Sequence, residues 1–259
     1  MNNILPYETD PPIFGFRFSP ARMKSIVEFI VANPVPLDGG VRCVVTANLD
    51  HICRLRVSPA FRHAYSDAWL RTIDGMPVLA YARLRGSTVP CRITGADLFA
   101  QLFDLLNPAT DRPFFVTACD EVGLALVSEL RSRGFSEMSV AYITPPYGFS
   151  DIAAEDERLA YIIRMHRCTH LFFGVGSPKS ELWIHSHRNE LGDLYAFCVG
   201  AALEFKTGMK KRAPSWMRRT GTEWLWRLGQ EPRRLARRYL LHSWYFWAAV
   251  RDDIWNRGA

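Results

Sequence analysis

Five short runs of apolar, β-branched and aromatic residues recur along the chain, and segments with helical periodicity lie between most of them. The runs cover residues 41–47, 113–118, 138–143, 170–176 and 194–199. Runs this short and this uniformly apolar are typical of strands that are buried on both faces. Strands that alternate with helices form a parallel sheet, because a parallel crossover requires a connection of helix length. The sequence therefore predicts an α/β fold, in which helices flank a parallel sheet.

Segments with an apolar face at helical spacing complete this pattern. They cover residues 21–31, 58–70, 96–106, 121–133, 152–167 and 179–191. The chain has 259 residues, of which 48% are hydrophobic, so it is long enough to bury a substantial core. Open parallel sheets bind ligands beyond the carboxyl ends of their strands. We therefore expect the functional residues at the ends of the five runs.

Positive charge and tryptophan are concentrated in the last part of the chain. Residues 206–259 hold 13 of the 32 Lys and Arg, four of the 26 Asp and Glu, and six of the eight Trp. Their helical periodicity is interrupted at Pro214 and Pro232. Basic and aromatic side chains on one helix are typical of a helix at a membrane surface. We therefore divide the chain into a body, residues 1–205, and a helical appendage, residues 206–259, which we expect to associate with an anionic membrane.

Several classes of protein are disfavoured by features that the sequence lacks. The first ten residues show no secretory signal, and no uncharged run approaches the roughly 18–20 residues that span a bilayer. The six cysteines show neither CxxC pairs nor a metal-ligand spacing with histidine. We expect reduced thiols, no metal site, and a cytoplasmic protein that meets a membrane only from the side.

Polar side chains follow the first predicted strand and the helix-like segment after it. Thr46 and Asn48 end the first run, and Asp74 precedes a glycine. Hydroxyl and amide groups can bind a polar ligand, and an exposed carboxylate at a turn can act as a general base. Each also has a local interpretation, because Asn caps helices and Asp-Gly is common turn chemistry.

Two further segments could bind a nucleotide. Residues 174–179 read as a strand end, a small-residue turn and a helix start, and exposed amides at such a start suit a phosphate. The turn matches neither the dinucleotide-binding motif nor the Walker motif. Glu204, after the last run, could meet a ribose or a base, or pair with an arginine of the appendage.

Read together, several blocks resemble one family of enzymes. Their order and spacing are similar to the WecG/TagA/CpsF family of bacterial glycosyltransferases, glycosyltransferase family 26, over roughly residues 12–240. The blocks that carry the resemblance are residues 46–51, 74–77, 92–98, 145–149, 174–183, 199–202, 211–214 and 223–235.

The resemblance implies a Rossmann-like body that transfers a sugar from a UDP-sugar to a saccharide on a polyprenyl diphosphate. The reaction would take place at the cytoplasmic face of the membrane, in the synthesis of a cell-surface polysaccharide. It would invert the anomeric carbon without a metal or another cofactor, consistent with the lack of a DxD motif. The resemblance also leads us to expect self-association.

The resemblance assigns roles to individual residues. Asp74 matches the proposed catalytic base, which takes the proton of the acceptor hydroxyl. Thr46, a second candidate catalytic residue, matches a position that lines the donor pocket, as does Asn48. Gly148 and Phe149 match the turn against which the nucleotide packs.

Further positions follow from the same comparison. Val199 and Glu204 match positions that hold the uridine. Two positions depart from the family pattern: Ser180, in the donor pocket, replaces a common Gln, and Glu204 replaces a common Asp. The resemblance assigns stabilisation of the departing UDP to three arginines of the appendage, which membrane docking would fold over the pocket. These are Arg227, Arg234 and Arg237.

Two other functions compete with the transferase. A nucleic-acid-binding module would use the basic residues for phosphates and the aromatic ones for base stacking, although no recognised motif is present. A catalytically inactive membrane scaffold is the second alternative, and Asp74→Asn would separate it from an enzyme. A dinucleotide enzyme is disfavoured because no glycine-rich turn follows the first strand. We expect no nucleic-acid partner.

Overall fold

A single parallel sheet forms the centre of the molecule. The computed structural model describes residues 4–6, 8–230 and 232–255, without the side chains at 219, 227 and 233–243. The sheet has six strands in the order β2-β1-β6-β5-β3-β4, and every neighbouring pair is parallel. The strands are β1 (Val41–Ala47), β2 (Leu70–Ile73), β3 (Pro113–Val116), β4 (Ala141–Ile143), β5 (His170–Phe173) and β6 (Leu194–Cys198). The predicted α/β fold with a parallel sheet is confirmed.

Strand β2 corrects the expected helix over residues 58–70. The helix α3 (Pro59–Ser66) begins at a Ser58 cap and ends well before residue 70. Leu70 then pairs with Val44 of β1 at the sheet edge, and the pairing continues to Ile73 and Ala47. A strand of four residues is too short to show a recognisable periodic pattern in the sequence. It forms because its backbone pairs with β1.

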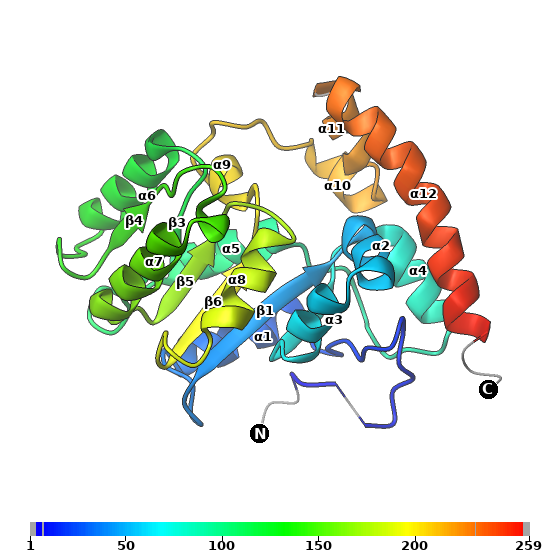
Figure 1. The fold of residues 1–259 in the computed structure, drawn as a ribbon, viewed down its shortest axis with the longest axis horizontal. Coiled ribbons are helices and arrows are strands. Elements are labelled where there is room, and N and C mark those ends of the chain that lie inside the picture. The colour runs from blue at the N-terminus through cyan, green and yellow to red at the C-terminus, as the bar shows by residue number, and fades with distance from the viewer. Residues whose placement is uncertain (1–3, 7, 231, 256–259) are drawn as a thin grey trace.

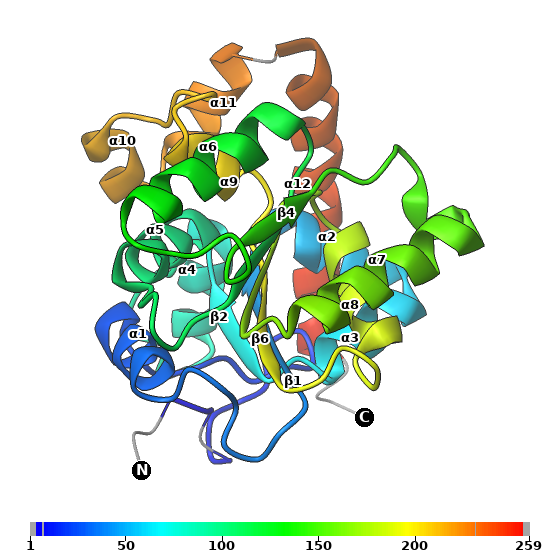
Figure 2. The same cartoon turned by 90° about the vertical axis from the view of Figure 1, so that its left-hand side faces the viewer.

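Helices cover both faces of the sheet (Figure 2). One face is covered by α2 (Leu49–Val57), α3, α4 (Met76–Leu84), α7 (Ala153–His166) and α8 (Lys179–His187). The other face is covered by α1 (Met23–Ala32), α5 (Gly95–Leu105), α6 (Asp120–Ser132) and α9 (Ala202–Lys206). Apart from the strand at 70–73, the six predicted helices recur with shifted ends.

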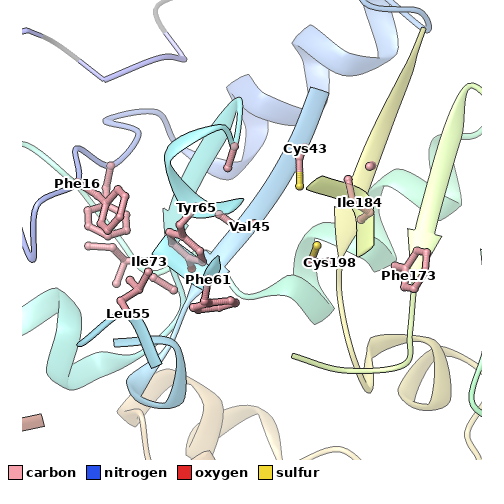
Figure 3. Packing of buried hydrophobic residues seen from close by; sticks show 14 of the residues in the cluster. Phe16, Cys43, Val45, Leu55, Phe61, Tyr65, Ile73, Phe173, Ile184 and Cys198 are labelled. Carbon is pink, nitrogen blue, oxygen red and sulfur yellow. The ribbon is translucent and has the colours of Figure 1, made fainter. Parts of the chain in front are cut away.

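Alternation along the strands builds a separate core on each face. Phe115 and Phe172 stack at 5.5 Å between ring centroids on the α5 face. Phe173, the next residue of β5, instead packs on Trp183 of α8 at 5.1 Å. Figure 3 shows part of the cluster on the face covered by α2, α3 and α8, where side chains of α2, α3 and β1 meet. Side chains that alternate between two cores explain why the strand runs are apolar throughout.

The described part of the appendage contains three helices, and its far end packs on the body. They are α10 (Ser215–Thr220), α11 (Glu223–Gln230) and α12 (Pro232–Trp255). In Figure 1, α12 runs beside α2 and α4. Phe246, Ala249 and Val250 are buried in the same cluster as the body core, and the Phe246 ring lies 5.9 Å from the Phe14 ring.

Ion pairs and hydrogen bonds fix the last turns of α12. Asp252 accepts a hydrogen bond from Arg56 Nε at 2.7 Å. The Tyr81 hydroxyl donates to Asp253 at 2.7 Å, and Arg85 also pairs with Asp253. The end of the appendage is therefore packed against the body through both apolar and charged side chains.

Candidate active site

The Asp74 turn is bound to the end of the neighbouring strand. The backbone N–H groups of Asp74 and Gly75 donate to the Ala47 carbonyl at 2.8 and 3.1 Å. A Cβ on residue 75 would lie 3.3 Å from the Asn48 Cα, so glycine permits this close approach. Asp74 itself is half-buried. The structure thus brings Asp74 beside Asn48 at the carboxyl edge of β1 and β2, where ligands of parallel sheets bind.

Thr46 and Val199 meet at the start of α5. Both are buried; Thr46 is the second-last residue of β1 and Val199 directly follows β6, which is the neighbour of β1 in the sheet. A Cβ on Gly95 would lie 3.3 Å from Thr46 Oγ1 and 3.5 Å from the Val199 Cα. The glycine at the first position of α5 therefore lets this helix approach both strand ends. Two of the residues assigned to the donor pocket are thereby held together.

Asn48 has a local structural role in addition to its place beside Asp74. Its Oδ1 accepts a hydrogen bond from the His51 N–H at 3.1 Å and caps α2. Within the described residues its Nδ2 group donates no hydrogen bond. The local interpretation of Asn48 as a cap is confirmed, and its backbone lies against Gly75 of the Asp74 turn.

His51 follows Asn48 but is turned into the core. Its Nδ1 lies 2.9 Å from the Tyr65 hydroxyl, and its Nε2 lies 3.6 Å from Glu181 Oε1 of α8. Burial lowers the pKa of His51, and the charge of Glu181 only partly opposes this shift. His51 therefore joins the start of α2 to the start of α8 and does not face a ligand.

The loops after β4 and β5 approach each other. Gly148 adopts a left-handed conformation with φ of 76°, as a tight turn requires. Phe149 is buried and its ring packs 6.5 Å from that of Phe173, so the core holds this turn in place. Lys179 Nζ lies 4.4 Å from the Tyr147 ring centroid and links the two loops.

The two positions that depart from the family pattern have local partners. Ser180 is buried, and its hydroxyl donates to the Gly176 carbonyl at 3.1 Å. Glu204 lies in α9, since β6 ends at Cys198. Its carboxylate pairs with Lys210 of the appendage at 2.9 Å. Among the described side chains, the appendage cation that contacts Glu204 is a lysine and not an arginine.

An ion-pair cluster between α5 and the appendage was not predicted from the sequence. The Asp97 carboxylate accepts hydrogen bonds from Arg212 at 2.7 Å and Arg218 at 3.3 Å. Burial raises the pKa of Asp97, but hydrogen bonds from Arg212 and Thr94 outweigh it, so the pKa lies below its usual value. Asp97 and Arg212 both lie in blocks that carry the family resemblance, at residues 92–98 and 211–214. Their separation along the chain gave no indication that the two side chains meet.

The appendage also contacts the Asp74 turn. Gly221 ends α10 in a left-handed conformation, and a Cβ there would clash with the Met76 side chain. Figure 1 shows α10 and α11 on the side toward which β1 points. Arg227 falls in α11, while Arg234 and Arg237 fall in α12; their side chains lie outside the described part of the structure. Within the described residues, no group of three or more metal-binding side chains occurs.

The family of the chain follows from a match to a known family of proteins. The sequence model of the glycosyl transferase WecG/TagA/CpsF family matches residues 11–259. The chain belongs to the WecG/TagA/CpsF family. The match includes the body and the appendage, so the resemblance drawn from the sequence is confirmed. The chain is a glycosyltransferase.

Two relatives of this WecG/TagA/CpsF protein carry the same name, N-acetylglucosaminyldiphosphoundecaprenol N-acetyl-beta-D-mannosaminyltransferase. The Staphylococcus aureus (strain MRSA252) protein is 28% identical over 225 residues, which cover 87% of this chain and 86% of that protein. The Bacillus spizizenii (strain ATCC 23059 / NRRL B-14472 / W23) protein is 29% identical over 227 residues, which cover 87% and 85%.

Proposed function

We propose that this glycosyltransferase moves a sugar from a UDP-sugar to a saccharide carried on a polyprenyl diphosphate. The observation that carries the proposal is the Asp74 turn, bound to the end of β1 beside Asn48. This edge of the sheet is where a donor binds in a Rossmann-like fold. The name of the two relatives, N-acetylglucosaminyldiphosphoundecaprenol N-acetyl-beta-D-mannosaminyltransferase, supports the choice of acceptor.

Asp74 acts as the general base in this mechanism. Its carboxylate accepts the proton of the acceptor hydroxyl while that oxygen forms a bond to the anomeric carbon of the donor. The bond from the anomeric carbon to the diphosphate oxygen breaks, and UDP leaves with the electron pair. Attack from the side opposite UDP inverts the anomeric carbon. The proton then passes from Asp74 to water.

The donor would occupy the space around the ends of β1, β6 and β4. Thr46 and Asn48 offer a hydroxyl and an amide to the sugar, and Val199 would pack against the uridine. Gly148 would present its backbone to the nucleotide, with Phe149 supporting that turn from the core. Ser180 and Glu204 would shape the same pocket, Ser180 by leaving the room that a longer side chain would fill and Glu204 beside Lys210.

The departing UDP carries negative charge that must be neutralised. We assign this to three guanidinium groups of the appendage, because guanidinium groups bind phosphate oxygens through paired hydrogen bonds. Our expectation that the reaction uses neither a metal nor another cofactor is retained as part of the proposal. The three residues are Arg227, Arg234 and Arg237.

The exposed face of α12 would bring the enzyme to its lipid-linked acceptor. No described helix is both long and apolar enough to cross a membrane. Trp244 and Trp247 are 77% and 67% exposed, while Phe246 between them is buried against the body. Residues three, seven and eleven positions apart share a face of a helix, so Arg251 and Trp255 extend the exposed tryptophan face. We propose that this face lies on an anionic membrane, at its cytoplasmic side.

The first experiment measures UDP release by the full chain on liposomes. A panel of UDP-sugars is offered with a short polyprenyl diphosphate-linked saccharide, to wild type and to Asp74→Asn. The matched control is Asp120→Asn, which changes an exposed aspartate at the first position of α6, the helix that follows β3 on the same edge of the sheet. Release that requires both the acceptor and Asp74 supports the proposal and identifies the donor.

Other outcomes are equally clear. Full turnover by Asp74→Asn would refute the role of Asp74. Absence of release with every donor, from a folded protein that binds liposomes but not UDP, would favour the membrane scaffold. Tight, salt-dependent binding of RNA or DNA would instead favour the nucleic-acid module.

A further inference from the structure

One partly buried charge cluster ties the start of the appendage to the body, and we name it the Asp97 clamp. Arg212 binds with both terminal nitrogens of its guanidinium group: Nη1 donates to Asp97 Oδ1 at 2.7 Å and Nη2 donates to Thr94 Oγ1 at 3.2 Å. Arg218 donates to the same Asp97 oxygen at 3.3 Å. Arg92 of the body completes the clamp by donating to the Arg218 carbonyl at 2.6 Å.

A single carboxylate holds the two appendage arginines in this clamp. The Nε atoms of Arg212 and Arg218 are buried and have no hydrogen-bond partner among the described residues. Asp97 is therefore the one acidic group that both guanidinium groups contact within the described part of the chain. Removing its charge would leave two neighbouring cations partly buried without a counter-ion, which is a costly arrangement.

The clamp is attached to the wall of the proposed donor pocket. Thr94 caps α5 by accepting the Asp97 N–H at 3.0 Å, and Gly95 between them contacts Thr46 and Val199. At the other end of α10, Gly221 packs on Met76, two residues after Asp74. The segment from Arg212 to Gly221 therefore connects the donor pocket with the turn that carries the proposed base.

We propose that Asp97 is a positioning residue for glycosyl transfer, which fixes the appendage over the pocket through Arg212 and Arg218. Asp97 touches no substrate and acts through the position of the helices that follow the clamp. The inference rests on the proposed function, because only a transferase needs the appendage arginines beside the departing UDP. The inference distinguishes two groups of arginines in the appendage. Arg212 and Arg218 bind the body, whereas the other group is assigned to the departing UDP.

The geometry ranks the substitutions. Asp97→Glu keeps the charge and should retain most of the activity. Asp97→Asn should lose it, because the amide cannot neutralise two cations. Arg212→Lys should resemble Arg212→Gln more than wild type, because an ammonium group cannot reach both Asp97 and Thr94 as a guanidinium group does. The matched control is Glu155→Gln: the Glu155 side chain is 31% exposed against 35% for Asp97, and it pairs with Arg158 on α7.

Two measurements test the proposal on the full chain. Turnover with liposomes gives kcat and the donor KM for each variant. Limited chymotrypsin digestion followed by mass spectrometry gives the ratio of cleavage after Trp216 and Trp224 in the appendage to cleavage after Tyr147, an exposed body residue. Chymotrypsin is chosen because none of the substitutions changes an aromatic residue.

We expect Asp97→Asn to lower kcat at least tenfold with a smaller change in the donor KM, and to raise the cleavage ratio at least threefold. Asp97→Glu and Glu155→Gln should match wild type in both measurements. A loss of kcat without a change in cleavage would overturn the proposal, because Asp97 would then act in the pocket and not through the appendage. Unchanged kcat and cleavage would overturn it as well.

Failure of the proposed function would look different. Wild type would then release no UDP with any donor, whereas the cleavage ratio would still show whether Asp97 holds the appendage. Circular dichroism of each variant shows whether the body remains folded. Where Asp97→Asn proves unfolded, Arg212→Gln takes its place, since it removes the contacts of Arg212 with Asp97 and Thr94 from the appendage side and keeps the contact between Arg218 and Asp97.

Discussion

The packing of α12 predicts a large difference between two neighbouring aromatic residues. Phe246 is 5% exposed and belongs to the core cluster of the body, whereas Trp247 points away from it. Phe246→Ala should therefore destabilise the whole protein. Trp247→Ala, in the next position of the same helix, should leave the stability almost unchanged. Both variants replace an aromatic residue by alanine, so the change in helix propensity contributes about equally to the stability of the two variants.

The size of the effect follows from burial. Truncation of a buried Phe to Ala costs about 3–5 kcal/mol, as lost transfer free energy and a cavity. Phe246 lies where a helix packs on the body, with Phe14 5.9 Å away on one side and the exposed Trp247 on the other. We therefore expect the low end of the range, about 3 kcal/mol. For a domain of this size the midpoint temperature should fall by roughly 6–12 °C.

The assay is urea denaturation followed by circular dichroism and by tryptophan fluorescence. Six of the eight tryptophans lie in the appendage, so fluorescence reports mainly on the appendage and circular dichroism on the whole chain. Coincident transitions in wild type would show that the appendage unfolds with the body. A loss below about 1 kcal/mol for Phe246→Ala would refute the reasoning, because α12 would then not be packed on the core in solution.

Three further predictions concern the base, the clamp and the membrane face. Gly75→Ala should lower kcat about tenfold, because the new Cβ would press on the Asn48 Cα and displace the Asp74 turn, which steady-state kinetics would detect. The pKa of Asp97 is lowered in the folded state, so its stabilisation should be complete above about pH 5 and be lost as the pH falls through the folded pKa; a pH series of unfolding free energies for wild type and Asp97→Asn checks this. The double variant Trp244→Ala/Trp247→Ala should weaken sedimentation with anionic liposomes at least about tenfold and leave the midpoint temperature unchanged.

Parts of the fold could be predicted because they depend on local pattern. The strand that ends at Ala47 and the one that ends at Phe173 are buried on both faces, and burial on both faces requires continuous apolar runs. Strand β2 was not predicted, because its four residues are stabilised by pairing with β1 and such pairing produces no periodic pattern in the sequence.

The candidate site divides in the same way. The residue types of Thr46, Asn48 and Asp74 are visible at the ends of segments, and their family pattern gives them roles. Their proximity is a property of the sheet, since β1 and β2 are neighbours and the Ala47 carbonyl binds the Asp74 turn. The burial of Phe149 also follows from packing, because its ring contacts a residue of another strand.

The sequence by itself determined the α/β class, the family, the residues that carry the proposed chemistry, and the basic, aromatic character of the appendage. Each of these depends on which residues occur and in what order. Only the tertiary structure decided that Asp97 meets Arg212, more than a hundred positions away along the chain, and that α12 divides its aromatic residues between the core and the surface. Such contacts depend on chain geometry in three dimensions, and residues far apart in sequence carry no local signal of their meeting.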